Sequence, residues 1–205
     1  MEAQVANGTV LWLSLDEFGQ ELRSLCCDLA PTETAQDVLV ATPPGPGSVV
    51  VVAASWEPAR ELAAVSDAAI ANDFALVPVV VNPIHVRVGP IVAGAAARCC
   101  YHCFAAMEQK RNASNKIGTY LQAVRSYPDN SVLRRIAGHT AAHVCLSAGI
   151  LEVGVSDPVG HDAVAWYSSH DGADLRMSRF EGVDGCRRCG VAMDDRTTFE
   201  GTSWI

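Results

Sequence analysis

Several short runs of apolar residues that do not alternate with polar ones lie in the first half of the chain. They cover residues 8–15 (GTVLWLSL), 36–42 (QDVLVAT), 48–55 (SVVVVAAS), 75–82 (ALVPVVVN) and 85–92 (HVRVGPIV). Short runs rich in β-branched residues and bounded by Gly, Pro or Asn predict strands. Because their apolar positions do not alternate, they are typical of a sheet that is covered on both faces.

Two amphipathic segments separate these predicted strands. Residues 16–30 place apolar side chains at helical spacing and end before Pro31. Residues 56–74 have Pro58 near the start and alanine-rich apolar spacing after it. Strands that alternate with helices predict an α/β domain, here of Rossmann-like type with a mainly parallel sheet.

The pattern changes in the second half of the chain. Residues 130–154 predict a long amphipathic helix, which we expect to be buried along one side. Residues 162–170 and 174–182 predict the two short strands of a hairpin.

The net charge and the lengths of the apolar runs exclude some classes of partner for this protein. The 205 residues carry a net charge of −8, which argues against a nucleic-acid duplex as the main partner because phosphate binding needs clustered Lys and Arg. No apolar run approaches the ~20 residues that span a bilayer, so no membrane partner is expected. The first ten residues lack the features of a signal peptide. We therefore expect a cytoplasmic protein whose eight cysteines are reduced.

Two Cys-x-x-Cys motifs lie more than 80 residues apart. The first hook is Cys100 and Cys103, and the second hook is Cys186 and Cys189, flanked by glycines. Two intervening residues let a tight turn aim both sulfurs at one point, and two such hooks close a tetrahedral tetrathiolate site that suits zinc. Four thiolates leave no open coordination position, so we expect a structural zinc that ties the hairpin end of the chain to the sheet.

Other interpretations of the cysteines and histidines are less favoured. A thioredoxin-type redox pair should lie at the start of a helix that follows a strand, and neither hook is predicted to do so. Of the remaining cysteines, only Cys99 could compete for the metal. His139 and His143 have a spacing that binds zinc on a helix, but no glutamate follows His139 as in metalloproteases.

The turn after the first predicted strand is unsuited to a nucleotide. Nucleotide-binding α/β domains place glycines there so that backbone amides approach phosphate. Here the turn reads LSLDEFGQE, with Gly19 as its one glycine and Asp16 and Glu17 where phosphate would lie. Acidic side chains repel a polyphosphate, so we expect no nucleotide on this chain.

The order SVVVVAAS, SDAA, ALVPVVVN, HVRVGPIV, CYHC and GCRRCG resembles the ThiF/MoeB-like (ubiquitin-activating-enzyme-like) adenylyltransferase fold. It is most similar to the degenerate ThiF-like partner proteins of YcaO cyclodehydratases, which act in the biosynthesis of thiazole/oxazole-modified peptides, including thiopeptides. The most specific part is the VRVGP strand, followed by a small-residue loop and CxxC, with a late CxxCG. The similarity covers residues 8–192.

The resemblance implies a non-catalytic scaffold or activator subunit. In such systems the ThiF-like protein binds the YcaO enzyme, which uses ATP to activate peptide amides so that Cys, Ser or Thr side chains cyclise to azolines. It also helps to present the leader of the precursor peptide. Active members of the wider fold carry a glycine-rich loop and an Asp-Asn pair where this chain has SLDEFG and Ser55-Trp56. The resemblance also makes a homodimer or heterodimer plausible.

We expect residues 1–192 to form one ThiF-like domain and residues 193–205 a polar C-terminal tail. Because the first predicted strand starts near residue 9, we expect this chain to lack the winged-helix-like leader-recognition domain that usually precedes the fold in the family it resembles. The apolar residues of the tail either dock on a partner or fold over the protein's own core. Two other functions stay open: a ThiF/MoeB-type adenylyltransferase with an atypical nucleotide loop, and an unrelated zinc-bearing protein-interaction module.

Overall fold

The structure of the protein is a computed structural model, and it describes residues 10–27, 44–82, 85–97, 99–112, 130–147, 163–169, 175–180 and 182–189. The helices are α1 (Glu17–Cys27), α3 (Ala59–Asn72), the short 3-10 helix η1 (Gly94–Ala96), α4 (Tyr101–Asn112) and α6 (Asn130–Ser147). The strands are β1 (Val10–Ser14), β2 (Val49–Ala54), β3 (Ala75–Val81), β4 (His85–Val88), β5 (Val92–Ala93), β6 (Ala163–Ser169) and β7 (Leu175–Phe180).

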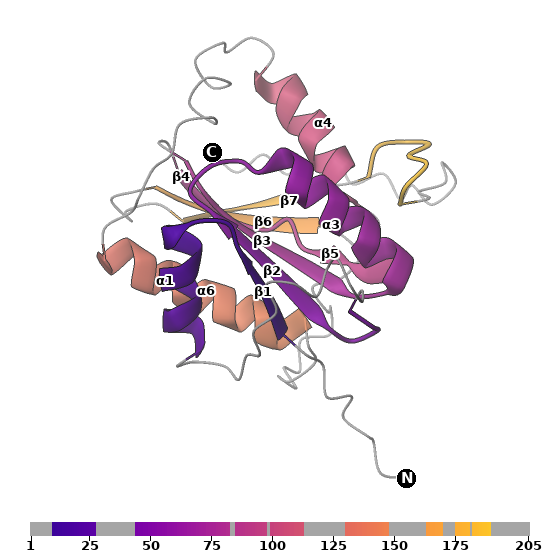
Figure 1. Cartoon of the computed structure of the whole chain (residues 1–205). Coiled ribbons are helices and arrows are strands. Elements are labelled where there is room, and N and C mark those ends of the chain that lie inside the picture. Colours follow the sequence, from indigo (N-terminus) through magenta and orange to yellow (C-terminus); the bar gives the residue numbers. More distant parts are fainter. Residues whose placement is uncertain are drawn as a thin grey trace.

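One sheet contains all the described strands, in the order β1-β2-β3-β4-β6-β7, with β5 paired to the end of β3 (Figure 1). Strands β1, β2 and β3 pair in parallel, and Val51 lies opposite both Trp12 and Val77. The pairings β3–β4, β3–β5, β4–β6 and β6–β7 are antiparallel. Strands β1, β2, β3 and β6 therefore run in one direction and the other three run in the opposite direction.

The predicted α/β class and its parallel βαβ core are confirmed, and the antiparallel hairpin is also in place. The apolar run at residues 85–92 forms two strands, β4 and β5, which are separated at Gly89 and Pro90. Both turn back along β3, so this part of the sheet is antiparallel. The predicted strand at 36–42 and the tail at 193–205 lie outside the described residues.

Helices cover both faces of the sheet. On one face, α1 and α6 pack over Val49, Val51 and Val77 with side chains such as Phe18 and Leu133. On the other face, α3 and the start of α4 cover the alternate residues of the same strands, which include Val50 and Val52. Every residue of β2 is fully buried, which confirms the prediction of a sheet covered on both faces.

Helix α4 was not predicted from the sequence. Its apolar residues occupy only the first part, from Tyr101 to Met107, and polar residues complete it. A segment of this kind has no single apolar face along its length, so periodicity does not identify it. The start of α4 matters for function because it carries the first hook.

Among the described residues, no helix has both the length and the apolar content needed to cross a lipid bilayer.

Candidate metal centre

The two cysteine hooks lie at the ends of two different elements. The first hook opens α4, with Cys100 just before the helix and Cys103 in its first turn. The second hook lies in the turn that follows β7 (residues 182–189), where Gly185 adopts a positive φ of 68°. Glycine adopts this conformation without the strain of a Cβ atom, so the chain can reverse immediately before Cys186.

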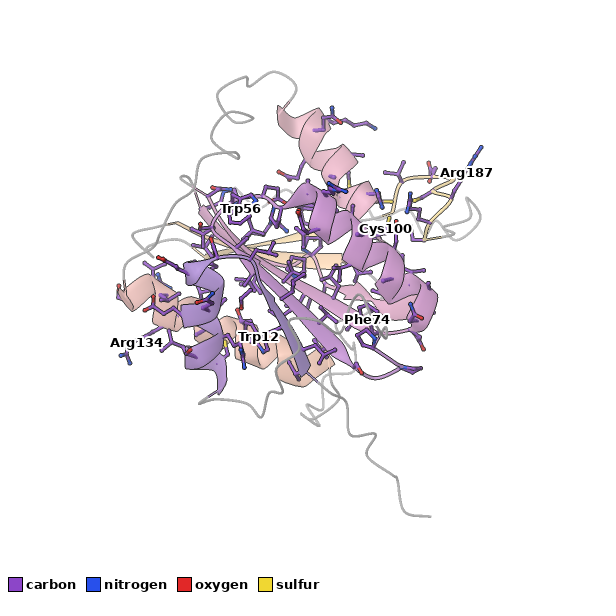
Figure 2. The ribbon with its side chains drawn as sticks, in the orientation of Figure 1. Trp12, Trp56, Phe74, Cys100, Arg134 and Arg187 are labelled. Atoms are coloured by element: carbon purple, nitrogen blue, oxygen red, sulfur yellow. The ribbon has the colours of Figure 1, made fainter. Side chains whose placement is uncertain are left out.

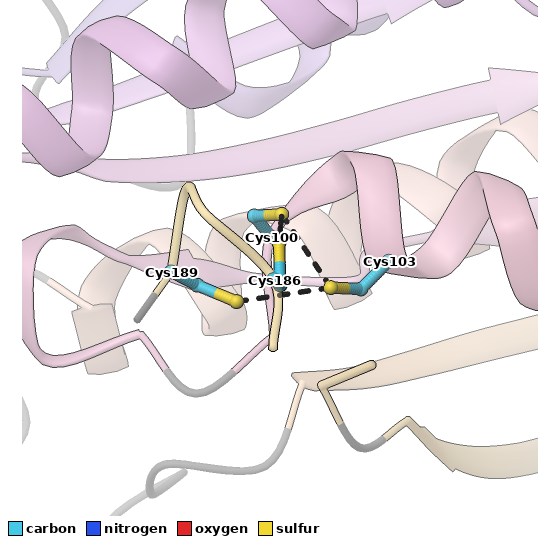
Figure 3. Close-up of side chains that lie close together, drawn as sticks. All are labelled: Cys100, Cys103, Cys186 and Cys189. Atoms are coloured by element: carbon cyan, nitrogen blue, oxygen red, sulfur yellow. Dashed lines mark hydrogen bonds between the residues drawn. The ribbon is translucent and has the colours of Figure 1, made fainter. Parts of the chain in front are cut away.

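The four thiols converge on one point (Figure 3). The Sγ–Sγ distances are 3.7 Å between Cys100 and Cys103, 3.8 Å between Cys100 and Cys186, and 3.7 Å between Cys103 and Cys189. All four sulfurs lie within 4.8 Å of one another. A disulfide has an S–S distance of about 2.05 Å, so these thiols are not cross-linked.

The spacing of the sulfurs fits a tetrahedral metal ion. A tetrahedral tetrathiolate site with Zn–S bonds of about 2.3 Å has S–S edges of about 3.8 Å. Three of the six edges between the sulfurs, at 3.7 Å, 3.8 Å and 3.7 Å, match this value, and the other three are no longer than 4.8 Å. The backbone N–H of Val183 donates to Cys103 Sγ at 3.2 Å. The donor set and its geometry therefore suit a closed-shell divalent ion such as Zn²⁺.

The thiols differ in how readily they ionise. Burial raises the pKa of Cys186, but hydrogen bonds from the backbone N–H groups of Cys189 and Arg188 outweigh it and lower the pKa to about 6. Burial raises the pKa of Cys189 to about 11, and it also raises the pKa of Cys100 well above its ordinary value. Metal binding must therefore displace protons from buried thiols, so acid opposes it.

Helix α3 supplies a carboxylate that contacts both hooks. Asp67 Oδ1 lies 3.0 Å from Nε2 of His102, which stands between the two cysteines of the first hook. Asp67 Oδ2 forms an ion pair with Arg188, which stands between the two cysteines of the second hook. All three side chains are partly exposed, at 35%, 34% and 50% for Asp67, His102 and Arg188.

A buried charged network lies on the other side of the first hook. Arg87 on β4 is 3% exposed and donates to both carboxylate oxygens of Glu57 at 2.7 Å. The hydroxyl of Tyr101, inside the first hook, donates to Glu57 Oε1 at 2.7 Å. The Arg87 guanidinium also lies 4.6 Å from the centre of the Phe104 ring, which follows Cys103. The first hook is thus joined to the strand β4 and to the segment between β2 and α3.

The turn after β1 is occupied by a side chain of the protein itself. Asp16 Oδ1 accepts a hydrogen bond from the N–H of Gly19 at 3.0 Å, which caps the start of α1. Asp16 Oδ2 accepts bonds from the N–H and the hydroxyl of Ser55, at 2.9 Å and 2.5 Å. A carboxylate therefore lies where a nucleotide-binding turn would direct its amides at phosphate.

The four residues predicted to bind the metal, Cys100, Cys103, Cys186 and Cys189, lie together. They form the group of potential metal ligands found among the described residues. Cys99 is buried outside it, and its thiol faces the carbonyl of Cys100 at 3.6 Å. The prediction that neither hook lies at the start of a helix was wrong, because Cys100 and Cys103 lie at the start of α4. The redox alternative is disfavoured instead because the thiols of both hooks meet. The side chains of His139 and His143, on α6, lie outside the described residues.

Sequence reasoning missed Asp67, Glu57 and Arg87. Only Arg87 carried a signal, since a lone arginine within the apolar run HVRV indicates a buried partner. The identity of that partner depends on how β4 is placed next to the β2–α3 segment, and periodicity contains no such information.

No protein-family model matches the chain, and no curated protein matches it. Solved structures do match. A structure described as a heterocyclase in complex with substrate and cofactor has a TM-score of 0.66 and 14% identity, over 91% of this chain and 26% of its own. The E. coli microcin synthetase McbBCD complex matches with a TM-score of 0.61 and 10% identity, over 87% and 67% of the two chains. E. coli MccB, solved with ATP, matches with a TM-score of 0.59 and 13% identity, over 91% of this chain and 68% of its own.

These matches show the fold. This chain spans about a quarter of the heterocyclase and about two thirds of the microcin proteins. The α/β class expected from the sequence is confirmed by the architecture that they share with it.

Proposed function

We propose that this chain is a zinc-stabilised scaffold subunit of an azoline-forming peptide cyclodehydratase complex. In this role it docks a YcaO-type enzyme, which carries out the ATP-dependent ring closure, and it helps to present the precursor peptide. The observation that carries the proposal is the tetrathiol cage formed by Cys100, Cys103, Cys186 and Cys189, which joins the hairpin end of the sheet to the βαβ part. The fold that holds this cage is shared with a heterocyclase and a microcin synthetase.

The cage supports a structural role for the metal. Four thiolate ligands around one ion would leave no coordination position for water or substrate, so a metal held there would have no Lewis-acid chemistry to offer. Cys100 and Cys103 are buried, and the pair Cys186 and Cys189 is half-buried. Zinc would stabilise the docking of the second hook on α3 and α4, and so maintain the surface that a partner meets.

The turn after β1 supports a role without catalysis. Asp16 uses both carboxylate oxygens to hold the start of α1 and the end of β2 together. A phosphate group entering the turn would meet this negative charge and would have to displace three hydrogen bonds. In this proposal the complex as a whole binds the precursor peptide and forms the azolines, and ATP binds to the partner enzyme.

A reconstitution experiment tests the proposal. The chain is purified with zinc and mixed with a YcaO-type enzyme encoded beside it, a precursor peptide and ATP, and loss of water from the peptide is followed by mass spectrometry. We expect ring formation to accelerate at least tenfold when the chain is present, and we expect the chain to co-elute with the enzyme. Equal rates with and without the chain, together with separate elution, would contradict the scaffold role.

An adenylyltransferase is the second candidate, because MccB shares the fold and has been solved with ATP. ATP–pyrophosphate exchange by the isolated chain, with the precursor peptide as carboxylate substrate, separates the two functions. The scaffold predicts no exchange above the rate of a chain-free control.

A further inference from the structure

The two hooks are attached to the rest of the protein in different ways. The first hook is part of the core: Cys100, Tyr101, Cys103 and Phe104 are each 3% exposed or less. Tyr101 is fixed further, because its N–H donates to Ser66 Oγ at 3.1 Å and its hydroxyl donates to Glu57. These contacts do not involve a metal, so the first hook has its conformation before any ion arrives.

The second hook is a surface turn. Gly185, Arg187 and Arg188 are exposed, and only Cys186 and Cys189 reach the core cluster around α3 and α4. Polar contacts also tie this turn to the rest of the protein. They include the bond from Val183 N–H to Cys103 Sγ and the ion pair between Arg188 and Asp67.

Asp67 occupies an unexpected place for a carboxylate. Four thiolates around one divalent ion carry a net charge of about −2, and a further negative charge nearby disfavours such a cage. Asp67 nevertheless contacts the residue inside each hook, with one oxygen for His102 and the other for Arg188. The position of Asp67 explains its role better than its charge does, because one residue on helix α3 contacts both hooks and so fixes them relative to each other.

We propose that Asp67 is a positioning residue of the metal centre, which holds the second hook against the preformed first hook so that all four thiols are aimed at one point before the ion binds. This inference rests on the metal centre of the proposed function. Preorganisation of this kind lowers the ordering cost of binding, and partners that orient ligands contribute about 10- to 100-fold to metal affinity where they are well buried. Because Asp67 and Arg188 are partly exposed, a contribution of about three- to tenfold is expected here.

The direction in which D67N changes the affinity for zinc distinguishes a positioning role of Asp67 from an effect of its charge alone. If Asp67 acted only through its charge, D67N would remove a repulsion and zinc would bind more tightly. Positioning predicts the opposite, with weaker zinc binding and faster release. Glu61, an exposed acid on the same helix, provides the matched control E61Q. Arg187 points away from the protein (Figure 2), and R187Q is the control for R188Q.

The experiment measures the zinc dissociation constant and the rate of zinc release by competition with a chromogenic chelator, on the full chain. We expect D67N and R188Q each to weaken binding about three- to tenfold and to speed release. The double variant D67N/R188Q should be no weaker than either single variant, because both remove the same contact. E61Q and R187Q should stay within about twofold of the wild type.

Two results decide the inference. Unchanged or tighter zinc binding by D67N and R188Q, with one zinc per wild-type chain, overturns the positioning role and leaves the metal centre intact. A wild-type chain that takes up no zinc removes the metal centre itself, and the positioning role with it. If D67N does not fold, the comparison of R188Q with R187Q gives the answer, since both arginines are exposed.

Discussion

At the scale of single residues, Asp16 shows how a turn can be closed to phosphate. Its carboxylate receives the N–H of Gly19 and both the N–H and the hydroxyl of Ser55. Hydrogen bonds to an ionised acceptor are stronger than those between neutral groups. The same side chain therefore caps α1, joins the end of β1 to the end of β2 and places negative charge in the turn.

Substitution of Asp16 measures this role. D16A removes the helix cap and leaves Ser55 without its acceptor, so we expect the free energy of unfolding to fall by about 2 kcal/mol. D16N keeps one acceptor oxygen and should lose about 1 kcal/mol. Urea unfolding of both variants provides the measurement. E17Q, at the exposed neighbour, is the control and should change stability by less than about 0.5 kcal/mol; a loss as large as that of D16A would show that charge rather than bonding matters.

The cage cysteines and Cys99 provide a second test at this scale. Cys189 faces Cys103 across the cage, whereas Cys99 is buried next to Cys100 with its thiol directed at a backbone carbonyl. C189A should abolish tight zinc binding, because three thiolates and one water make a weaker site. C99A should retain one zinc per chain at close to the wild-type affinity. Zinc content after dialysis, measured by atomic emission, would contradict the assignment if C99A lost its metal or C189A kept it.

At the scale of elements, two glycines in helices differ in how closely other atoms pack against them. Gly19 lies in α1, where a Cβ atom would come within 2.8 Å of Ala53 O and 3.0 Å of Ser14 Cα. Both are backbone atoms, so they cannot rotate away as a flexible side chain would. Gly138 lies in α6, is exposed, and has nothing within 4 Å of its Cβ position. The first glycine lets helix α1 lie close to strands β1 and β2, and the second has no packing role.

The same substitution should therefore change stability in opposite directions at these two positions. G19A is expected to destabilise the protein by about 2–3 kcal/mol, because helix α1 must move away from the strands. G138A is expected to stabilise it by about 0.5–1 kcal/mol, because alanine reduces the flexibility of the unfolded chain and favours the helix. Thermal unfolding followed by circular dichroism compares the two. A loss of stability in both variants would show that α6 is packed differently at Gly138.

Much of the architecture at this scale followed from sequence patterns, while the pairing directions did not. Non-alternating runs such as VVVVAA identified buried strands, and the spacing of the cysteines identified all four members of the cage. A run such as HVRVGPIV contains no information on strand direction, so β4 and β5 could not be placed antiparallel to β3. Likewise, Glu57 and Arg87 are 30 residues apart, and only the folded chain brings them together.

At the scale of the whole molecule, the cage closes a long loop of the chain. Cys103 and Cys189 are 86 residues apart, and the hairpin β6–β7 lies between them. The βαβ part, from β1 to β3, has a core on its α1/α6 face that contains no cage cysteine, while the core on its α3 face includes the buried Cys100 and Cys103. Metal binding should therefore affect the two ends of the sheet unequally.

Removal of the metal tests this asymmetry. In the chelator-treated protein we expect residues 182–189 to exchange their amide hydrogens about tenfold faster or more, because the second hook then depends on Asp67 and a few apolar contacts. The first turn of α4 should keep its protection, because its core contacts do not involve the metal. Strands β1, β2 and β3 should keep their protection, since their hydrogen bonds join the strands to one another and the first hook stays packed in the core without the metal. Hydrogen exchange measured by mass spectrometry compares both regions in one sample, and C189A should show the fast pattern with or without zinc. If all strands lost protection together on chelation, the metal would be required for the entire fold rather than for the attachment of its C-terminal hook.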